Sequence, residues 1–321
     1  TSSINKGTEI ALELLKQERP FCNPETLEKT APKIAQEQLR NFISTISPTG
    51  LDYTINLSTL AAMHRVAWLP EMRNTVSQMV TSVINKFPAL AYMFEEKSLS
   101  KTDWTPTIHA TKTIIRTEPT LKLINSDVDY DKISLHKNND SVDLGYFDPK
   151  YMNNNLQTIR TEVEVSIATM GQDQRHRSIK RGIPILTGSF YMPEILIKLG
   201  LKNKANEFMS KYLELCKKIP KTLAISIAPY GAMVKYEKLA DINALIHEQE
   251  KRTCWCAQEE IYWLSVLLRK ELEQSYNKEN KLLEVLMPPC YENGKCQEGA
   301  RYCGRNLKDR INKNFFPKRK V

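Results

Sequence analysis

Residues 162–178 read Glu-Val-Glu-Val-Ser-Ile-Ala-Thr-Met-Gly-Gln-Asp-Gln-Arg-His-Arg-Ser. The first six residues, Glu162 to Ile167, alternate between polar and apolar, which is the two-residue period of a half-buried β-strand. After the strand comes Arg175-His176-Arg177, where two guanidinium groups flank an imidazole. Such crowding of cations is favourable only when an anion shares it, and the arginine fork matches phosphate oxygens. The stretch therefore predicts a strand that leads to an anion-binding turn, with an exposed, solvated basic turn as the alternative.

The chain before this stretch is mainly helical in pattern. Apolar residues recur at spacings of three and four over residues 72–87, which predicts a helix. A shorter helix is expected at residues 60–68. Residues 107–124 are rich in β-branched and aliphatic side chains and indicate β-structure. The polar residues 126–143 indicate an exposed loop or insertion.

The chain after the Arg-His-Arg turn begins with a second β-like run at residues 183–192. Helices are expected at residues 205–216, from residue 223 towards residue 247, and at residues 261–272. Strands and helices in these proportions predict an α+β fold.

The main division is expected near residue 150. Residues 1–150 would form a mainly helical N-terminal region with an extension or insertion, and residues 151–321 would form the region that contains the basic turn. A chain of 321 residues can hold one large domain or two modest ones.

The chain carries 46 Lys and Arg against 37 Asp and Glu, a net charge of +9. This excess favours anionic partners, and nucleotides, nucleic acid and an anionic membrane all satisfy it. No apolar run approaches the roughly 20 residues that a membrane span needs, and the first residues lack the apolar core of a signal peptide. We therefore expect no membrane association.

Seven cysteines, an odd number without a secretory context, favour reduced thiols and a cytoplasmic location. Five of them could supply the four ligands of a thiolate metal site: Cys254, Cys256, Cys290, Cys296 and Cys303. Their spacings are wider than the close pairs of a zinc finger. We therefore expect no metal, with these five cysteines as weak candidates.

Three motifs in order along the chain resemble the flavin-dependent thymidylate synthases, the ThyX family. The first is Arg-His-Arg after an alternating strand, followed by Ser-Phe-Tyr-Met-Pro at residues 189–193. The second is Arg-Thr-Cys-Trp-Cys-Ala-Gln-Glu-Glu-Ile at residues 252–261; family members have an arginine, a short spacer, then Ala-Gln and Glu-Ile opening a helix that faces the active site. The third is the cysteine-containing tail, residues 290–305, which is similar to one branch of the family. Together they span about half of the chain.

The resemblance implies a homotetrameric α+β enzyme with a mixed helix and antiparallel-sheet domain. Such an enzyme binds FAD and methylates deoxyuridine monophosphate (dUMP). It takes the one-carbon unit from methylenetetrahydrofolate and the reducing equivalents from NADPH through the flavin. The protein's own tasks are then positioning and charge stabilisation.

By the same resemblance, Arg175, His176 and Arg177 contact FAD, and Gln172 lies where the family often has a glutamine beside the flavin. Arg252 matches the family arginine that binds the pyrimidine ring and stabilises negative charge during the reaction. An arginine suits this catalytic role because it keeps its proton and can donate two parallel hydrogen bonds to a carbonyl edge.

Two further residues complete the expected cofactor site. His247 stands where the family has an asparagine near the flavin, and Gln258 belongs to the second motif.

The sequence departs from the family at the nucleotide phosphate. Ile185 and Thr187 replace a serine and an arginine that hold this phosphate, and Ile225 replaces another arginine. Lys180 and Arg181 are nearby cations that could bind the substrate instead. Each lost arginine contact costs on the order of a few kcal/mol, so the family phosphate pocket is not expected here and a changed substrate is the simpler interpretation.

Three hypotheses follow. The first is a ThyX-like flavoenzyme that transfers a one-carbon unit to a pyrimidine nucleotide, such as dUMP or a related substrate. The second is a catalytically inactive or repurposed flavin- or nucleotide-binding homologue. The third, a nucleic-acid-binding protein, rests only on net charge and the Lys318-Arg319-Lys320 tail, without a recognisable motif.

Overall fold

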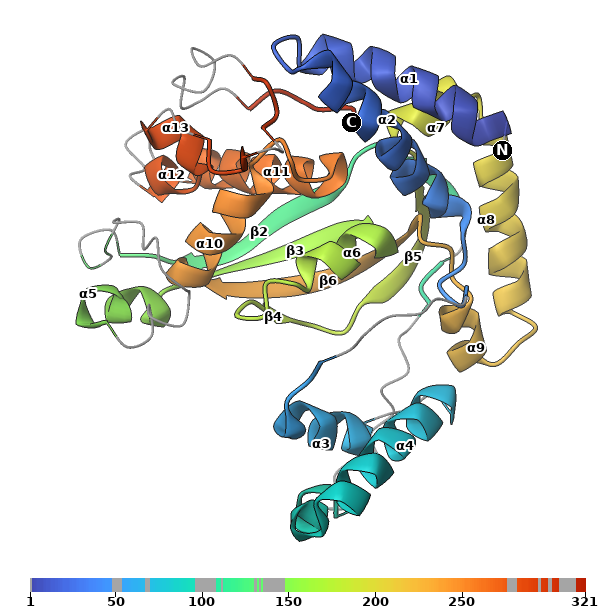
Figure 1. The fold of residues 1–321 in the computed structure, drawn as a ribbon, viewed down its shortest axis with the longest axis vertical. Helices are drawn as coiled ribbons and strands as arrows, with labels where there is room; N and C mark the ends of the chain where they lie inside the picture. The colour runs from blue at the N-terminus through green and yellow to red at the C-terminus, as the bar shows by residue number, and fades with distance from the viewer. Residues whose placement is uncertain are drawn as a thin grey trace.

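Helices surround one curved β-sheet in the computed structural model of the protein (Figure 1). The structure describes residues 2–47, 54–66, 70–95, 108–110, 112–129, 132, 134, 148–275, 282–293, 296–299, 302–305 and 316–321. The strands are β1 Ile114–Arg116, β2 Thr120–Asp127, β3 Thr158–Ser166, β4 Lys180–Arg181, β5 Ile185–Tyr191 and β6 Ala232–Asp241. The helices are α1 Ser2–Glu18, α2 Pro24–Leu39, α3 Leu57–Val66, α4 Pro70–Lys86, α5 Pro149–Met152, α6 Ile167–Asp173, α7 Glu194–Lys198, α8 Lys202–Cys216, α9 Lys221–Ser226, α10 Ile242–Arg252, α11 Glu259–Ser275, α12 Leu282–Val285 and α13 Pro289–Asn293. Short 3-10 helices occur at Arg40–Phe42, Pro88–Phe94 and Asn153–Leu156.

The sheet has the strand order β1-β5-β6-β3-β2, and β4 pairs with β6 outside this path. Only the β1–β5 pair is parallel among the described strands; the other pairs are antiparallel. The predicted mixture of helices with a largely antiparallel sheet is thus confirmed. The strands expected around residues 162–167 and 183–192 are β3 and β5.

Strand β6 corrects the helix expected from residue 223 towards residue 247. In that stretch α9 ends at Ser226, β6 occupies Ala232–Asp241, and only α10 is helical beyond it. From residue 234 to 240 alternate side chains of β6 are buried, which is the period of a strand. Because β6 pairs with both β3 and β5, it lies at the centre of the sheet.

A second correction concerns the link between β3 and the basic turn. The two-turn helix α6 separates them, so the strand does not lead directly to the turn. Ser166 ends β3 and caps α6, because its Oγ accepts a hydrogen bond from the Thr169 backbone N–H at 3.1 Å.

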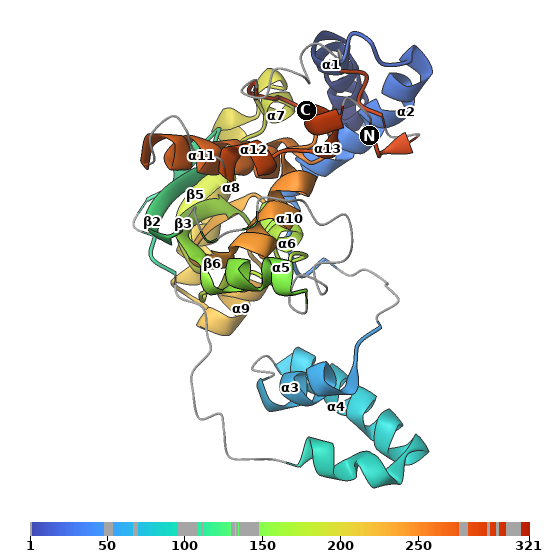
Figure 2. The same cartoon turned by 90° about the vertical axis from the view of Figure 1, so that its left-hand side faces the viewer.

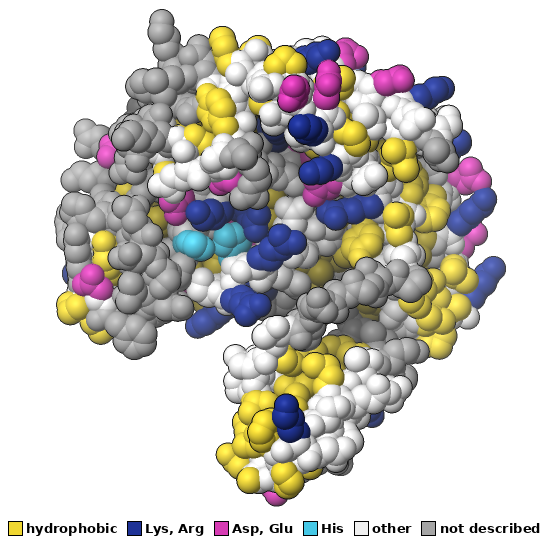
Figure 3. All heavy atoms as spheres, viewed as in Figure 1, with side chains coloured by type: hydrophobic (Ala, Val, Ile, Leu, Met, Phe, Trp, Pro, Cys, Tyr) yellow, Lys and Arg dark blue, Asp and Glu magenta, His cyan; other side chains and the backbone are white. Residues whose placement is uncertain are grey.

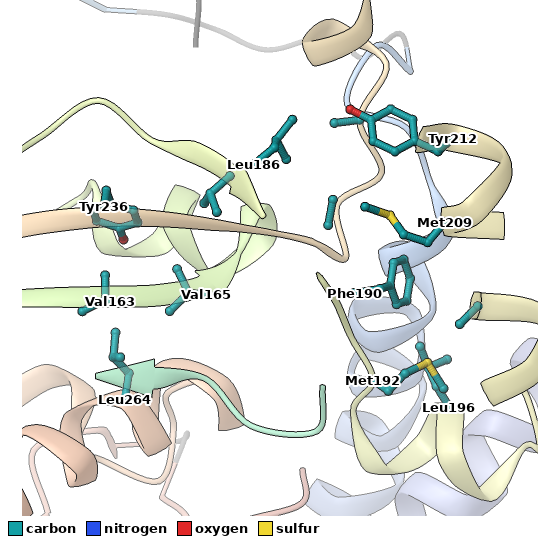
Figure 4. Close-up of a cluster of buried hydrophobic side chains, with 14 residues drawn as sticks. Val163, Val165, Leu186, Phe190, Met192, Leu196, Met209, Tyr212, Tyr236 and Leu264 are labelled. Atoms are coloured by element: carbon teal, nitrogen blue, oxygen red, sulfur yellow. The ribbon is translucent and has the colours of Figure 1, made fainter. Parts of the chain in front are cut away.

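The main hydrophobic core fills the space between the sheet and α8. Figure 4 shows Phe190 of β5 facing Met209 of α8, with Val163 and Val165 of β3 in the same cluster. A second cluster joins β3 to α10 and α11 through Ile159, among others. These two clusters fix α6, α10 and α11 against the sheet.

The N-terminal helices belong to the same body. Helices α1 and α2 pack on each other and on α7 through Leu14, Ala31 and Ile195. The sheet also takes strands from both sides of residue 150, since β1 and β2 precede it. The sheet is therefore shared by the two regions that the sequence suggested.

Helices α3 and α4 form a separate small unit. They lie away from the sheet in both views (Figure 2) and have their own cluster, which includes Leu60, Val76 and Phe94. The helices expected at residues 60–68 and 72–87 correspond to α3 and α4. No described helix combines the length and the hydropathy that a membrane crossing requires.

Candidate functional site

The basic turn is anchored by a buried carboxylate at the end of α6. Asp173 is fully buried and accepts hydrogen bonds from Lys238 Nζ at 2.6 Å and from the Tyr236 hydroxyl at 2.9 Å, both on β6. Lys238 also donates to Glu248 of α10 at 2.7 Å. Burial alone would raise the pKa of Asp173, but Lys238 and Arg181 outweigh it and hold this pKa below its ordinary value. The network therefore ties α6, β6 and α10 together with compensated charges.

Arg181 completes this network from β4. Its Nε donates to Asp173 Oδ2 at 2.5 Å, and its Nη1 donates to the carbonyl oxygens of His176 and Ile179 at 3.0 and 2.8 Å. The sequence suggested Lys180 and Arg181 together as substrate ligands. In the structure Arg181 directs its donors into the turn, whereas Lys180 is exposed and makes no ion pair with a described residue.

Arg252, at the C-terminal end of α10, meets the basic turn. Its Nε donates to His176 Nε2 at 2.8 Å, and its Nη2 donates to the Gln172 backbone carbonyl at 2.8 Å. The His247 ring lies 5.7 Å from the His176 ring, centroid to centroid, in an edge-on arrangement. Residues from two distant motifs thus form one contiguous cluster.

His176 is neutral in this cluster. Burial, followed by the nearby charges of Arg252 and His247, lowers its pKa to about 3. Since Nε2 accepts from Arg252, the ring proton is assigned to Nδ1. The His176 Nε2 therefore orients the Arg252 guanidinium.

The surface above the cluster has uncompensated positive charge. Figure 3 shows histidine side chains surrounded by lysine and arginine side chains on this face. Arg175, Arg177 and Lys180 are exposed, and none of them forms an ion pair with a described residue. Arg252 is partly buried and likewise has no carboxylate within 4.0 Å in the described part of the chain. An anion is the ligand that such a surface favours.

The two glutamines of the expected site lie towards α2 and α11. The Gln172 side chain donates to Glu37 of α2 at 3.3 Å. Gln258 precedes α11, and its Oε1 accepts from the Thr169 hydroxyl of α6 at 2.9 Å. Gln172 is thus part of α6 and Gln258 contacts α6, but neither side chain bonds to Arg252.

The three positions that lack the family phosphate ligands have other contacts. The Thr187 hydroxyl donates to Glu164 of β3 at 2.6 Å. Ile225 of α9 packs against the main core, and Ile185 begins β5. None of the three supplies a cation.

Three residues of the site were missed by sequence reasoning: Asp173, Lys238 and Glu248. A signal existed for Lys238, because it continues the buried register of Val234 and Tyr236 along β6. An ionisable residue at a buried strand position requires a charged partner. The identity of that partner depends on the packing of α6 and α10.

The cysteines near α11 form no disulfide with one another or with any other described residue. Cys254 and Cys256 lie in the connection between α10 and α11, where the Cys256 backbone N–H donates to Cys254 Sγ at 3.4 Å. The interaction with Cys256 lowers the pKa of Cys254 to about 7. Cys290, Cys296 and Cys303 likewise form no disulfide among the described residues. Within the described residues, no group of three or more His, Cys, Asp or Glu side chains is arranged to hold a metal ion.

Comparison with known proteins gave weak structural likeness only. No protein-family model and no curated protein matches the chain. The crystal structure of a UMP/dUMP methylase PolB from Streptomyces cacaoi bound with 5-Br UMP aligns at 14% identity and a TM-score of 0.40, covering 51% of this chain and 92% of that one. The 5-Br dUMP complex aligns at 13% identity and a TM-score of 0.38, covering 50% and 92%. Likeness at this level assigns neither fold nor function.

Proposed function

We propose that the protein is a ThyX-like flavoenzyme that transfers a one-carbon unit reductively to a pyrimidine nucleotide, such as dUMP or a related substrate. The observation that supports this most is the contact of Arg252 with His176 and Gln172. Arg252 lies 76 positions after His176 and 80 positions after Gln172 in the sequence, and the family resemblance assigned all three to one site. Their convergence is what a shared cofactor and substrate site requires.

The cations of the turn suit a dinucleotide cofactor. FAD carries two phosphates, and Arg175 and Arg177 offer guanidinium groups that have no acidic partner among the described residues. Gln172, His247 and Gln258 would complete its site. FAD would supply the hydride, with NADPH as reductant and methylenetetrahydrofolate as one-carbon donor.

Arg252 is the residue that would act on the substrate. Two of its nitrogens are held by His176 and Gln172, while Nη1 has no hydrogen-bond partner among the described residues. A guanidinium fixed in this way can present its remaining N–H groups to a pyrimidine carbonyl. It would stabilise negative charge on that ring without reorganising.

A second candidate function is a flavin- or nucleotide-binding homologue without catalysis. The neutral residues at positions 185, 187 and 225 favour it, because they remove phosphate contacts that an active family member would use. A nucleic-acid-binding role has less support, since Arg319 of the basic tail is buried and Lys318 pairs with Glu118.

The test is a set of turnover assays on purified protein that contains flavin. We expect NADPH oxidation that depends on methylenetetrahydrofolate and a pyrimidine nucleotide, with methylated product identified by mass spectrometry. Flavin binding without product would favour the inactive homologue. Light scattering on the same sample tests the expected homotetramer.

A further inference from the structure

A cavity of about 430 Å³ lies between α2, residues 256–259 and the end of the described chain. In Figure 1 the C-terminus lies near α2, and Arg319 and Val321 line the cavity. Its volume falls within the range of about 300–1,000 Å³ that is typical of small-molecule sites. Arg252 and the arginines of the basic turn do not line it, whereas Gln258, which belongs to the proposed cofactor site, does.

One face of α2 forms a wall of the cavity. Leu27, Ala31 and Ala35 point to the other side of α2, where they pack in the cluster with α1. Lys29 and Lys33, one helical turn apart, line the cavity instead. The amphipathic helix thus offers ammonium groups to the cavity.

Two arginines contribute from outside α2. Arg19 is only 8% exposed and donates from Nη2 to the Trp255 carbonyl at 3.0 Å, while its Nε has no acceptor among the described residues. Arg319 is buried as well: its Nη1 donates to the Ala257 carbonyl at 2.8 Å, its Nη2 donates to the Val321 carbonyl, and its Nε lies 3.8 Å from Glu18 Oε2. A buried guanidinium with an unsatisfied N–H costs free energy, which a bound acceptor would recover.

The carboxyl side chains of the cavity do not neutralise these cations. Burial raises the pKa of Glu259 to about 8, so this group is largely protonated at neutral pH. Glu37, which lines the cavity, forms an ion pair at 3.2 Å with Arg40, which does not line it. Lys33 has no ion pair with any described residue. The cavity is therefore net positive and can attract an anion.

Gln172 connects the cavity to Arg252. Its backbone carbonyl accepts from Arg252 at 2.8 Å, and its side chain donates to Glu37, which lines the cavity, at 3.3 Å. Gln172 thus contacts both Arg252 and a residue that lines the cavity. A ligand with an aromatic ring and an anionic end could contact both.

We propose that this cavity holds the phosphate of the pyrimidine nucleotide, through Lys33, Arg19 and their neighbours, in place of the phosphate ligands that the sequence lacks at Ile185, Thr187 and Ile225. The inference rests on the proposed function, since it assumes a nucleotide whose ring lies at Arg252. It assigns substrate binding to the N-terminal helices, which lie outside the motifs. Arg19 and Lys33 act as binding residues only, and no chemical step depends on them.

The experiment is calorimetric titration of the full chain with dUMP, deoxyuridine and inorganic phosphate. The wild type should bind dUMP more tightly than deoxyuridine, because only dUMP carries the phosphate. Lys33→Gln should weaken dUMP binding roughly tenfold to a hundredfold and leave deoxyuridine binding unchanged. Lys33 is exposed, so this variant should fold, while Arg19→Gln provides a second test once its melting temperature has been checked.

The matched control is Lys16→Gln, which removes the same charge from the exposed side of α1 outside the cavity. It should bind dUMP as the wild type does. Equal weakening by Lys16→Gln, or none by Lys33→Gln, would overturn the inference while the proposed function stands. If neither dUMP nor deoxyuridine binds but FAD does, the substrate assignment fails together with the inference. Loss of FAD binding as well would instead remove the proposed function.

Discussion

Two groups of charged residues meet at the turn after α6: a buried group, called the lower layer, and an exposed group, called the upper layer. They differ in whether their charges are paired. In the lower layer every charge has a partner: Asp173, Lys238, Glu248 and Arg181 are buried or partly buried and bonded to one another. In the upper layer the exposed arginines of the turn have no acidic partner among the described residues. The difference indicates that the lower layer maintains the shape of the turn, whereas the upper layer is where we propose that a ligand binds.

A substitution in the lower layer should have the largest effect on stability. Asp173→Ala leaves Lys238 and Arg181 without their shared carboxylate in a buried setting, and we expect a loss of about 3–5 kcal/mol in the free energy of unfolding. Urea denaturation measures it. The control is Lys211→Ala in the exposed pair with Glu207, which should leave the unfolding midpoint almost unchanged. A similar midpoint for both variants would contradict the account of the lower layer.

Substitution of Arg252, which contacts the turn, should instead reduce activity and leave stability largely unchanged. Arg252→Ala removes the donor that we propose faces the substrate, and we expect turnover to fall roughly 100- to 1,000-fold. Circular dichroism should show an intact fold, because Arg252 lies outside the Asp173 network. Arg252→Lys keeps the charge but loses the fork, so it should not restore turnover. Full activity of either variant would remove Arg252 from the catalytic role.

The pH dependence of stability tests whether the fold keeps His176, which lies between the two layers, neutral. The pKa of His176 is about 3 in the folded protein, against about 6.5 for an unperturbed histidine. The unfolded state therefore binds the proton first, and stability is lost as pH falls below about 6.5. Between pH 7 and pH 5 the loss from His176 should be about 1–2 kcal/mol.

His176→Gln tests this dependence, because glutamine keeps an acceptor for Arg252 but does not titrate. Its denaturation midpoint should change less between pH 7 and pH 5 than that of the wild type. Arg252, His247, Lys238 and Asp173 all act on this imidazole, so the comparison is made at constant ionic strength. Parallel pH profiles for the two proteins would show that His176 is not held neutral by the fold.

The smallest effect is expected for Lys180, and it distinguishes this cation from its neighbour Arg181. Lys180→Gln should leave stability unchanged and reduce nucleotide or cofactor affinity only a few-fold, since its flexible ammonium group is exposed. Arg181→Gln should reduce stability, because Arg181 holds Asp173 and the turn carbonyls. Calorimetry and urea denaturation of both variants distinguish the roles. The assignment fails if Arg181→Gln affects binding alone.

The sequence predicted the elements that have a long, regular period. Helices α4 and α11 follow their apolar spacing, and β3 follows its alternation. It missed β6 because buried Ala232, Met233 and Val234 interrupt the alternation at its start. It missed α6 because seven residues are too few to establish a helical period.

The site was predictable only in part, for a related reason. The residues that we propose contact a ligand were suggested by motifs along the chain. The residues that support them were not, because Asp173, Lys238 and Glu248 become partners only when α6, β6 and α10 pack together. Even within the motif, the charge state of His176 depends on burial and on Arg252, which sequence alone does not supply.

The most direct measurement is a titration of flavin-free protein with FAD, followed by flavin fluorescence, at low and high salt. The account predicts binding that weakens with salt and falls roughly a hundredfold in the double variant Arg175→Gln, Arg177→Gln. The double variant Lys202→Gln, Lys204→Gln removes the same charge from exposed positions on α8 and should bind as the wild type does. Absence of FAD binding, or equal affinity in both double variants, would contradict the claim that the unpaired cations of the turn form a flavin site.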